Sequence, residues 1–229
     1  MVPLLLPLLV TSLTTAEPDY CNITTCPHVE DHTMCVFDTD GPAPMCDTVV
    51  TRGITPGDQT TILAVHNRLR AAVQKGEYSQ RGLPPAVSLP PLSWDQELAT
   101  LAQRWADQCM DDSDLCRDVQ RFKVGQNVAM IFGQKNWTRA IEECYFTEQL
   151  ENFNQTSLTY QAPPEDDFGM TDTSKLSQLL WAATTKVGCG YIAVKFWLSE
   201  EVGPGDVHAY ICNYGPAGNI PGQTMYTKA

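Results

Sequence analysis

Apolar residues recur at helical spacing in four stretches of the chain. Thr55, Pro56 and Gly76 have the residue types of a helix start and a helix stop, which predicts a helix over about 56–75. Ser93 and Gln96 fit a capping box at the start of a second helix, whose apolar stripe runs to Cys109. Two more helices are predicted over about 137–153 and 176–184.

Other stretches have the period of strands. Residues 189–197 and 208–214 alternate well enough to form a pair of antiparallel strands, and 125–129 predict a shorter strand. Residues 76–92 contain four prolines and read as a long loop. Helices placed on both faces of such a sheet would give an α/β sandwich.

The N-terminal part of the chain differs from the rest. Residues 1–16 form an apolar run that contains no acidic residue, and we expect a signal peptide cleaved after Ala16. This run is too short and too rich in threonine for a membrane anchor. Residues 17–53 lack a regular pattern and hold four cysteines, so we expect an arm held down by cross-links. Residues 54–229 would form the main domain.

The cysteine count indicates an oxidising compartment. Nine cysteines behind a signal peptide predict four disulfides and one remaining thiol in a secreted, extracellular protein. In that setting His28 and His32, beside arm cysteines, are interpreted as surface residues and not as zinc ligands. Three sequons predict a glycoprotein, in which we expect two of Asn22, Asn136 and Asn154 to be modified.

The formal net charge of −12 limits the classes of partner. An acidic surface argues against nucleic acid and against anionic membranes. No stretch after the N-terminal run is long enough to span a membrane, so we expect a released, soluble monomer.

Several motifs occur in order along the chain. They are His66-Asn67-x-x-Arg70, residues 125–129, 177–190 and 210–220, and in the arm Tyr20-Cys21 with residues 32–35. Together these motifs resemble those of the CAP superfamily, which comprises cysteine-rich secretory, antigen 5 and pathogenesis-related proteins. The arm resembles that of the arthropod antigen 5 (venom allergen 5) branch.

The resemblance implies an α+β fold, a three-layer α-β-α sandwich with a disulfide-stapled N-terminal arm. It also implies a pairing of the cysteines, in which Cys144 has no counterpart. Cys144 would then be a buried free thiol or, as an alternative, form an intermolecular disulfide. The implied pairs are Cys21 with Cys35, Cys26 with Cys116, Cys46 with Cys109, and Cys189 with Cys212.

Members of the family commonly have a cleft in which two histidines and two acids can bind zinc. The matching positions here are Ser113, Gln126, Glu148 and Lys175. A protonated lysine repels a cation, so we predict no zinc, no other metal and no cofactor, with Lys175 instead paired to Glu148.

The sequence does not favour catalysis. A Ser113–Lys175 pair has no oxyanion hole that the sequence reveals, and no Gly-x-Ser-x-Gly motif occurs. His66 is interpreted as a helix-packing residue and His208 as a strand-surface residue. We therefore expect a protein that is not an enzyme.

Two functions remain open, besides a secreted role in haemolymph or cuticle. The first is binding of a lipid or hydrophobic small molecule, as in some relatives, with ordinary core packing as the alternative explanation for the residues concerned. The second is a venom or salivary effector or allergen that binds a host protein through loops 76–92 and 155–175. The candidate ligand-lining residues are Trp137, Ile141, Tyr145, Phe146, Leu150 and Phe153.

Overall fold

The computed structural model describes residues 18–153, 157–163, 172–199 and 203–229. The predicted signal peptide, the sequon at Asn154 and, within loop 155–175, residues 155–156 and 164–171 lie outside the described residues. No helix in the described part of the chain is long and apolar enough to cross a membrane.

A sheet of five strands forms the centre of the molecule. Its main path has the order β1-β4-β5-β3, and β2 pairs in parallel with β4. Strands β4 and β5 form a long antiparallel hairpin in which Cys189 lies opposite Cys212. The predicted strands are therefore present, and β4 and β5 are longer than the alternation alone showed. The strands are β1 (Val49–Arg52), β2 (Ser93–Trp94), β3 (Gly125–Phe132), β4 (Lys186–Ser199) and β5 (Gly203–Gly215).

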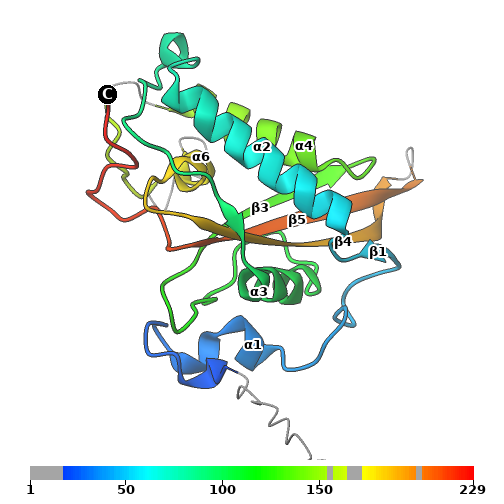
Figure 1. Ribbon diagram of the computed structural model, residues 1–229. Helices are drawn as coiled ribbons and strands as arrows, with labels where there is room; N and C mark the ends of the chain where they lie inside the picture. Colours follow the sequence, from blue (N-terminus) through cyan, green and yellow to red (C-terminus); the bar gives the residue numbers. More distant parts are fainter. Residues whose placement is uncertain (1–17, 154–156, 164–171, 200–202) are drawn as a thin grey trace, which may run out of the picture.

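Helices cover both faces of the sheet, so the three-layer sandwich is confirmed (Figure 1). Helix α3 (Gln96–Ala106) lies on one face, together with the arm. On the other face lie α2 (Pro56–Gln74), α6 (Ser174–Leu180) and the helical segment 137–152. The largest apolar cluster fills the space between this second layer and the sheet.

The predicted start of α2 agrees with the structure, whereas the predicted start of α3 does not. Thr55 and Asp58 form a capping box at the start of α2, and Gly76 follows its end with a φ of 79°. The predicted capping box at Ser93 is wrong, because Ser93 and Trp94 pair with β4 instead. Asp95 caps α3 by accepting a hydrogen bond from the Leu98 N–H at 3.1 Å.

The third helix is present but is not α-helical throughout. It consists of α4 (Trp137–Arg139), a π-helical segment η4 (Ala140–Thr147) and α5 (Glu148–Asn152). The N–H of Glu148 donates to the carbonyl of Glu143, the five-residue spacing of a π-turn. Helix α6 ends at Leu180, earlier than predicted.

Two glycines allow α3 to pack closely on the sheet. A Cβ atom on Gly188 would lie 2.2 Å from the Ala99 backbone nitrogen, and one on Gly190 would lie 2.3 Å from the Gln103 nitrogen. Any side chain at either position would collide with the helix backbone. The Gly-Cys-Gly sequence in β4 therefore has a packing reason.

The arm contains only short helical turns: η1 (Tyr20–Asn22), η2 (Val29–Asp31) and α1 (Thr33–Val36). Its last residues form the edge strand β1, which the sequence pattern did not show. The four disulfides are Cys21–Cys35, Cys26–Cys116, Cys46–Cys109 and Cys189–Cys212, the pairs that the resemblance implies. Two of them join the arm to the segment that follows α3.

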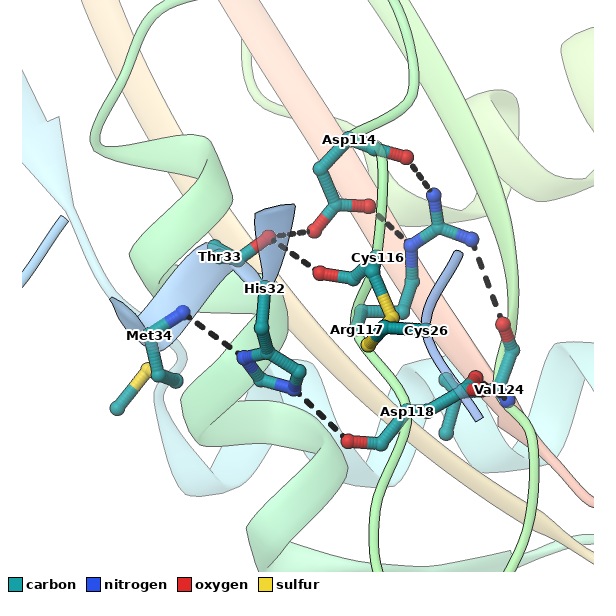
Figure 2. The surroundings of a disulfide bond; sticks show 9 residues. All are labelled: Cys26, His32, Thr33, Met34, Asp114, Cys116, Arg117, Asp118 and Val124. Atoms are coloured by element: carbon teal, nitrogen blue, oxygen red, sulfur yellow. Dashed lines mark hydrogen bonds and ion pairs between the residues drawn. A yellow bond between two sulfur atoms is a disulfide. The ribbon is translucent and has the colours of Figure 1, made fainter. Parts of the chain in front are cut away.

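Hydrogen bonds reinforce this attachment around the Cys26–Cys116 disulfide (Figure 2). Thr33 donates to the carboxylate of Asp114, which also pairs with Arg117. The interpretation of His32 as a surface residue is wrong, because its ring is fully buried and bonds to the Asp118 carbonyl at 2.8 Å. His32 instead holds the arm against the loop after α3.

Candidate functional site

The His66, Asn67 and Arg70 motif on α2 fixes the second helical layer. Asn67 donates to the Leu92 carbonyl and accepts from the Leu92 N–H, at 3.0 and 2.6 Å. The fully buried guanidinium of Arg70 donates to four backbone carbonyls, those of Pro90, Leu179, Trp181 and Thr184. These two side chains fasten the loop before β2 and the end of α6, so their roles are structural.

His66 is held in its neutral form. Its Nδ1 donates to the Ile62 carbonyl, because a carbonyl can only accept, and its Nε2 therefore accepts from the Tyr214 hydroxyl, each at 2.8 Å. Burial lowers the pKa of His66 to about 4. The interpretation of His66 as a packing residue agrees with this environment.

His208 has a similar environment, and its interpretation as a surface residue is wrong. Its side chain is buried between the Tyr191 hydroxyl and the Gly133 carbonyl, at 2.6 and 2.8 Å. The exposed His28 is the one histidine whose interpretation as a surface residue agrees with the structure. Each of the three buried imidazoles is bonded to backbone groups or to a tyrosine hydroxyl, so in the described part of the chain none contacts a serine or cysteine nucleophile.

The four cleft positions do not form a ligand set for a cation. Gln126 donates to the Asn213 side chain at 3.0 Å and accepts from the Asp114 N–H at 3.3 Å. Ser113 and Glu148 are exposed and Lys175 is half-buried. One carboxylate, one ammonium, one amide and one hydroxyl do not suit zinc, which takes neutral imidazoles, thiolates and carboxylates.

Two observations bear on the neighbouring charges. No ion pair joins Lys175 to Glu148 in the described part of the chain, so the predicted pairing is not present there. Nor do the described residues contain a group of three or more His, Cys, Asp or Glu side chains arranged to hold a metal ion.

Cys144 is the one free thiol among the described residues, and it is half-buried in η4. Burial is the main cause that raises its pKa, and the negative charge of Glu148 adds to this effect, while Lys175 opposes it. A raised pKa keeps the thiol protonated and weakly reactive.

Most of the predicted ligand-lining residues belong to the core. Trp137, Ile141, Tyr145, Phe146 and Leu150 are at most 4% exposed and pack in the main apolar cluster. The Tyr145 hydroxyl donates to the Tyr210 carbonyl at 2.7 Å, as a buried tyrosine usually must. For these five residues, ordinary core packing is the better explanation. Phe153 differs, because it is only partly buried.

Phe153 borders a cavity of about 630 Å³, between the end of α5 and the start of α6. Proteins use cavities of this size for small molecules. The apolar part of its lining consists of Phe153, Ala162, Pro163 and Met225, to which Tyr160 adds an aromatic ring. The remaining residues that line it are Asn152, Ser157, Thr159, Gln161, Thr173 and Ser177.

The polar residues in the described lining of this cavity are all uncharged. It offers hydroxyl and amide groups, and none of its described residues is Lys, Arg, His, Asp or Glu. The pKa of Tyr160 is raised, first by burial and then by the nearby carboxylate of Asp172. The described residues can therefore bind an apolar body and hydrogen-bond a neutral polar group, but they offer an anion no counter-charge.

The sequence could not reveal this cavity. Its lining comes from the end of α5, the loop 157–163, the start of α6 and the C-terminal segment around Met225. These segments are far apart along the chain and share no periodic pattern. Of the residues that line the cavity, the sequence analysis named only Phe153 as a ligand-lining candidate, as one of the apolar residues of the third helix.

Two of the three predicted glycosylation sites lie in the described part of the chain, and both are exposed. The Asn22 amide donates to Asp19, while the Asn136 side chain caps α4 through its oxygen and leaves its amide nitrogen without a bond in the structure described. Glycosylation at either site stays a prediction.

Comparisons with known proteins agree with the motifs and the fold. A family model described as the cysteine-rich secretory protein family (CAP) matches residues 63–214. Venom allergen 3 of Solenopsis invicta is 38% identical over 219 residues, which cover 93% of this chain and 90% of that protein. Venom allergen 5 of Brachyponera chinensis is 38% identical over 207 residues, covering 85% and 96% of the two chains.

Solved structures show the same fold at lower identity. A crystal structure of NaASP2 with Zn²⁺ aligns with a TM-score of 0.60 and 23% identity, covering 82% of this chain and 91% of that one. The structure of BmVAL-1 aligns with a TM-score of 0.54 and 21% identity, covering 83% and 88%. The matched family model, the relatives over nearly the full length and the sandwich together show that this chain belongs to the cysteine-rich secretory protein (CAP) family and is related to the venom allergens.

Proposed function

We propose that this protein is secreted, is not an enzyme, and binds a neutral amphipathic small molecule in the cavity between α5 and α6. The observation that carries the proposal is the cavity of about 630 Å³, lined by apolar, hydroxyl and amide groups and by no charged residue among those described. Secretion is supported by the four disulfides, which fit an extracellular protein.

A non-enzymatic role is supported by how the reactive groups are used. The buried histidines are bonded to backbone groups or to tyrosine hydroxyls, and burial raises the pKa of the Cys144 thiol. Ser113 is exposed, and no hydrogen bond to its hydroxyl is present in the described structure. The arrangement lacks the activated nucleophile and oriented base that covalent catalysis requires.

The absence of charge among the described lining residues favours one chemical class of ligand. An ionised fatty acid would place its carboxylate beside hydroxyl and amide groups without a cation, which leaves much of its desolvation uncompensated. A fatty alcohol or another uncharged amphiphile would need only one or two hydrogen bonds from those same groups. We expect the neutral ligand to bind more tightly.

The test is a fluorescence titration with a labelled fatty alcohol and the labelled fatty acid of the same chain length. We expect the alcohol to bind and the acid to bind at least about tenfold more weakly, a difference of about 1.4 kcal/mol. Equal binding of the two ligands would contradict the neutral-ligand assignment, and no binding of either would contradict the proposed function.

A pair of variants ties the binding to the cavity. Ala162 is exposed at its edge, so Ala162→Phe would fill part of the space without disturbing the core. We expect this variant to weaken alcohol binding by about tenfold. The matched control is Ala71→Phe, which changes an alanine that is also exposed but lies on α2, away from the cavity, and it should leave binding unchanged.

The second candidate function is a venom or salivary effector that binds a host protein. One observation favours it: loop 76–92 is held rigidly, with Leu83, Ala86 and Leu89 buried and Ala86 bridged to Lys228, while Val87 is 60% exposed. A fixed loop with an exposed apolar side chain suits recognition. Replacing Val87 with serine without loss of binding to an identified host target would count against this function.

A further inference from the structure

Three large aromatic side chains are exposed at one end of the sheet. Phe132, Phe196 and Trp197 are 53%, 54% and 61% exposed, and we call this group the hairpin tip. Phe132 ends β3, while Phe196 and Trp197 lie near the end of β4. Figure 1 shows this end of the β4–β5 hairpin reaching beyond α2 and α3.

The strand register explains why the side chains of Phe196 and Trp197 are uncovered. Phe196 lies opposite Gly205, which has no side chain, and Trp197 lies opposite Pro204. Cross-strand neighbours normally cover large side chains on a sheet. Phe196 and Trp197 are therefore exposed because the residues opposite them on β5 are too small to cover them.

The tip presents aromatic surface on both faces of the sheet. Val194 and Val207 are paired across β4 and β5 and pack in the apolar cluster that contains residues of α3. Phe132 lies opposite Val207, and Phe196 follows Val194 by two residues, so both share that face. Trp197 is the next residue and points to the opposite face.

A projecting ribbon that is aromatic on both faces fits a lipid interface better than a flat protein surface. A flat partner would bury only one face, whereas a headgroup layer surrounds both. Tryptophan and other aromatic rings also favour the depth of lipid headgroups, where an apolar body and a polar edge are both satisfied. The nearby Lys195 and Asp206 are paired with each other, and the sequence between β4 and β5 contains Glu200 and Glu201, so this part of the chain is acidic.

The net charge of the protein favours zwitterionic lipids over anionic lipids. The chain has a net charge of −12, which repels an anionic bilayer. A phosphatidylcholine surface is neutral overall, and its outermost group is a quaternary ammonium, which aromatic rings bind through cation–π contacts. We propose that the hairpin tip docks this protein reversibly on zwitterionic, choline-bearing lipid surfaces.

The experiment is co-sedimentation of the whole secreted protein with phosphatidylcholine vesicles, and with vesicles that also contain phosphatidylserine. We expect binding to phosphatidylcholine and weaker binding when phosphatidylserine is present. The double variant Phe196→Ser, Trp197→Ser should bind about tenfold more weakly. The matched control, Met45→Ser with Leu115→Ser, removes two side chains that are 65% and 77% exposed elsewhere, and should bind as the wild type does.

Fluorescence provides a second readout that does not depend on the amount bound. Trp105, Trp137 and Trp181 are buried, Trp94 is half-buried and Trp197 is exposed. Brominated phosphatidylcholine should quench the wild type, while Trp197→Phe should still bind and lose most of the quenching.

Three results would overturn the proposal: equal binding of the tip variant and the control, preference for phosphatidylserine vesicles, or a vesicle-free dimer that the tip variant abolishes. The last result would make the tip an interface between two copies. Because the tip lies apart from the residues that line the cavity, Ala162→Phe should leave vesicle binding unchanged, so this test and the ligand titration can fail separately.

Discussion

At the residue scale, the side chains with the most reactive chemistry serve structure. His32, His66 and His208 each donate to a backbone carbonyl from one ring nitrogen, and the other nitrogen is bonded to a backbone N–H in His32 and to a tyrosine hydroxyl in His66 and His208. The sequence shows that histidines are few and lie far from any nucleophile motif. It could not show that His32 is buried, because His32 lies in an arm without a regular pattern. It could not show that His208 is buried either, because the helices that cover its strand come from distant parts of the sequence.

The neutral state of His66 gives the protein a defined sensitivity to acid. Burial lowers the pKa of His66 to about 4, below its value of 6.5 in the unfolded chain. Its contribution to stability is therefore complete above pH 6.5 and is lost as the pH falls towards 4, by about 3 kcal/mol. Urea unfolding at about pH 7 and pH 4 should show a smaller loss in His66→Gln than in the wild type.

The control for this prediction is His28→Gln, which changes an exposed histidine in the arm. It should keep the full acid sensitivity of the wild type. If the two variants lose the same free energy of unfolding between these pH values, His66 is not the source.

At the element scale, the amphipathic patterns predict most helices and strands, and the errors have physical causes. Ser93 has the residue type of a helix cap, but pairing with β4 takes precedence over that local preference. The 3.6-residue period cannot distinguish an α-helix from one with π-turns, so η4 was not foreseen. Strand β1 is short, and all four of its residues are exposed, so it has no alternation to detect.

Helix α2 provides an element-scale prediction through two arginines. Arg70 is buried and bonded to four carbonyls, whereas Arg68 is exposed and pairs with Glu142. Arg70→Met should lower the free energy of unfolding by roughly 3 kcal/mol or more, because it leaves buried carbonyls without donors. Arg68→Met should change it by less than about 1 kcal/mol.

Chemical denaturation of both variants checks this comparison. The two substitutions remove the same side chain from the same helix, so helix propensity and net charge change equally. Similar losses of stability in the two variants would contradict the role assigned to Arg70.

At the scale of the whole molecule, cross-links attach an arm with little regular structure to a sandwich that has its own core. The motifs imply the fold and the cysteine pairs through family resemblance. The cavity and the hairpin tip depend on how distant segments meet, and no local pattern in the sequence encodes that arrangement. Predictions of function from the sequence therefore placed the ligand along the third helix, where five of the six residues prove to be core.

The Cys26–Cys116 disulfide provides a test of how the arm is held. It joins residues 90 positions apart, so replacing both cysteines with alanine should lower the free energy of unfolding by about 4 kcal/mol. Limited proteolysis should then cut the arm faster than in the wild type. The control is Cys144→Ala, which removes the half-buried thiol that forms no disulfide. If the arm of the double variant is cut no faster than that of the wild type, the other contacts hold the arm without this disulfide, and the role assigned to it is wrong.

The central claim is that the cavity between α5 and α6 carries a small neutral amphiphile. Native mass spectrometry of the protein secreted from insect cells, followed by extraction and identification of any bound molecule, tests this claim most directly. We predict a stoichiometric, uncharged amphiphile on the wild type and on Ala71→Phe, and much less of it on Ala162→Phe. A protein that is secreted without any bound molecule and does not take up the labelled fatty alcohol, or one that carries its ligand equally in Ala162→Phe, would contradict the account.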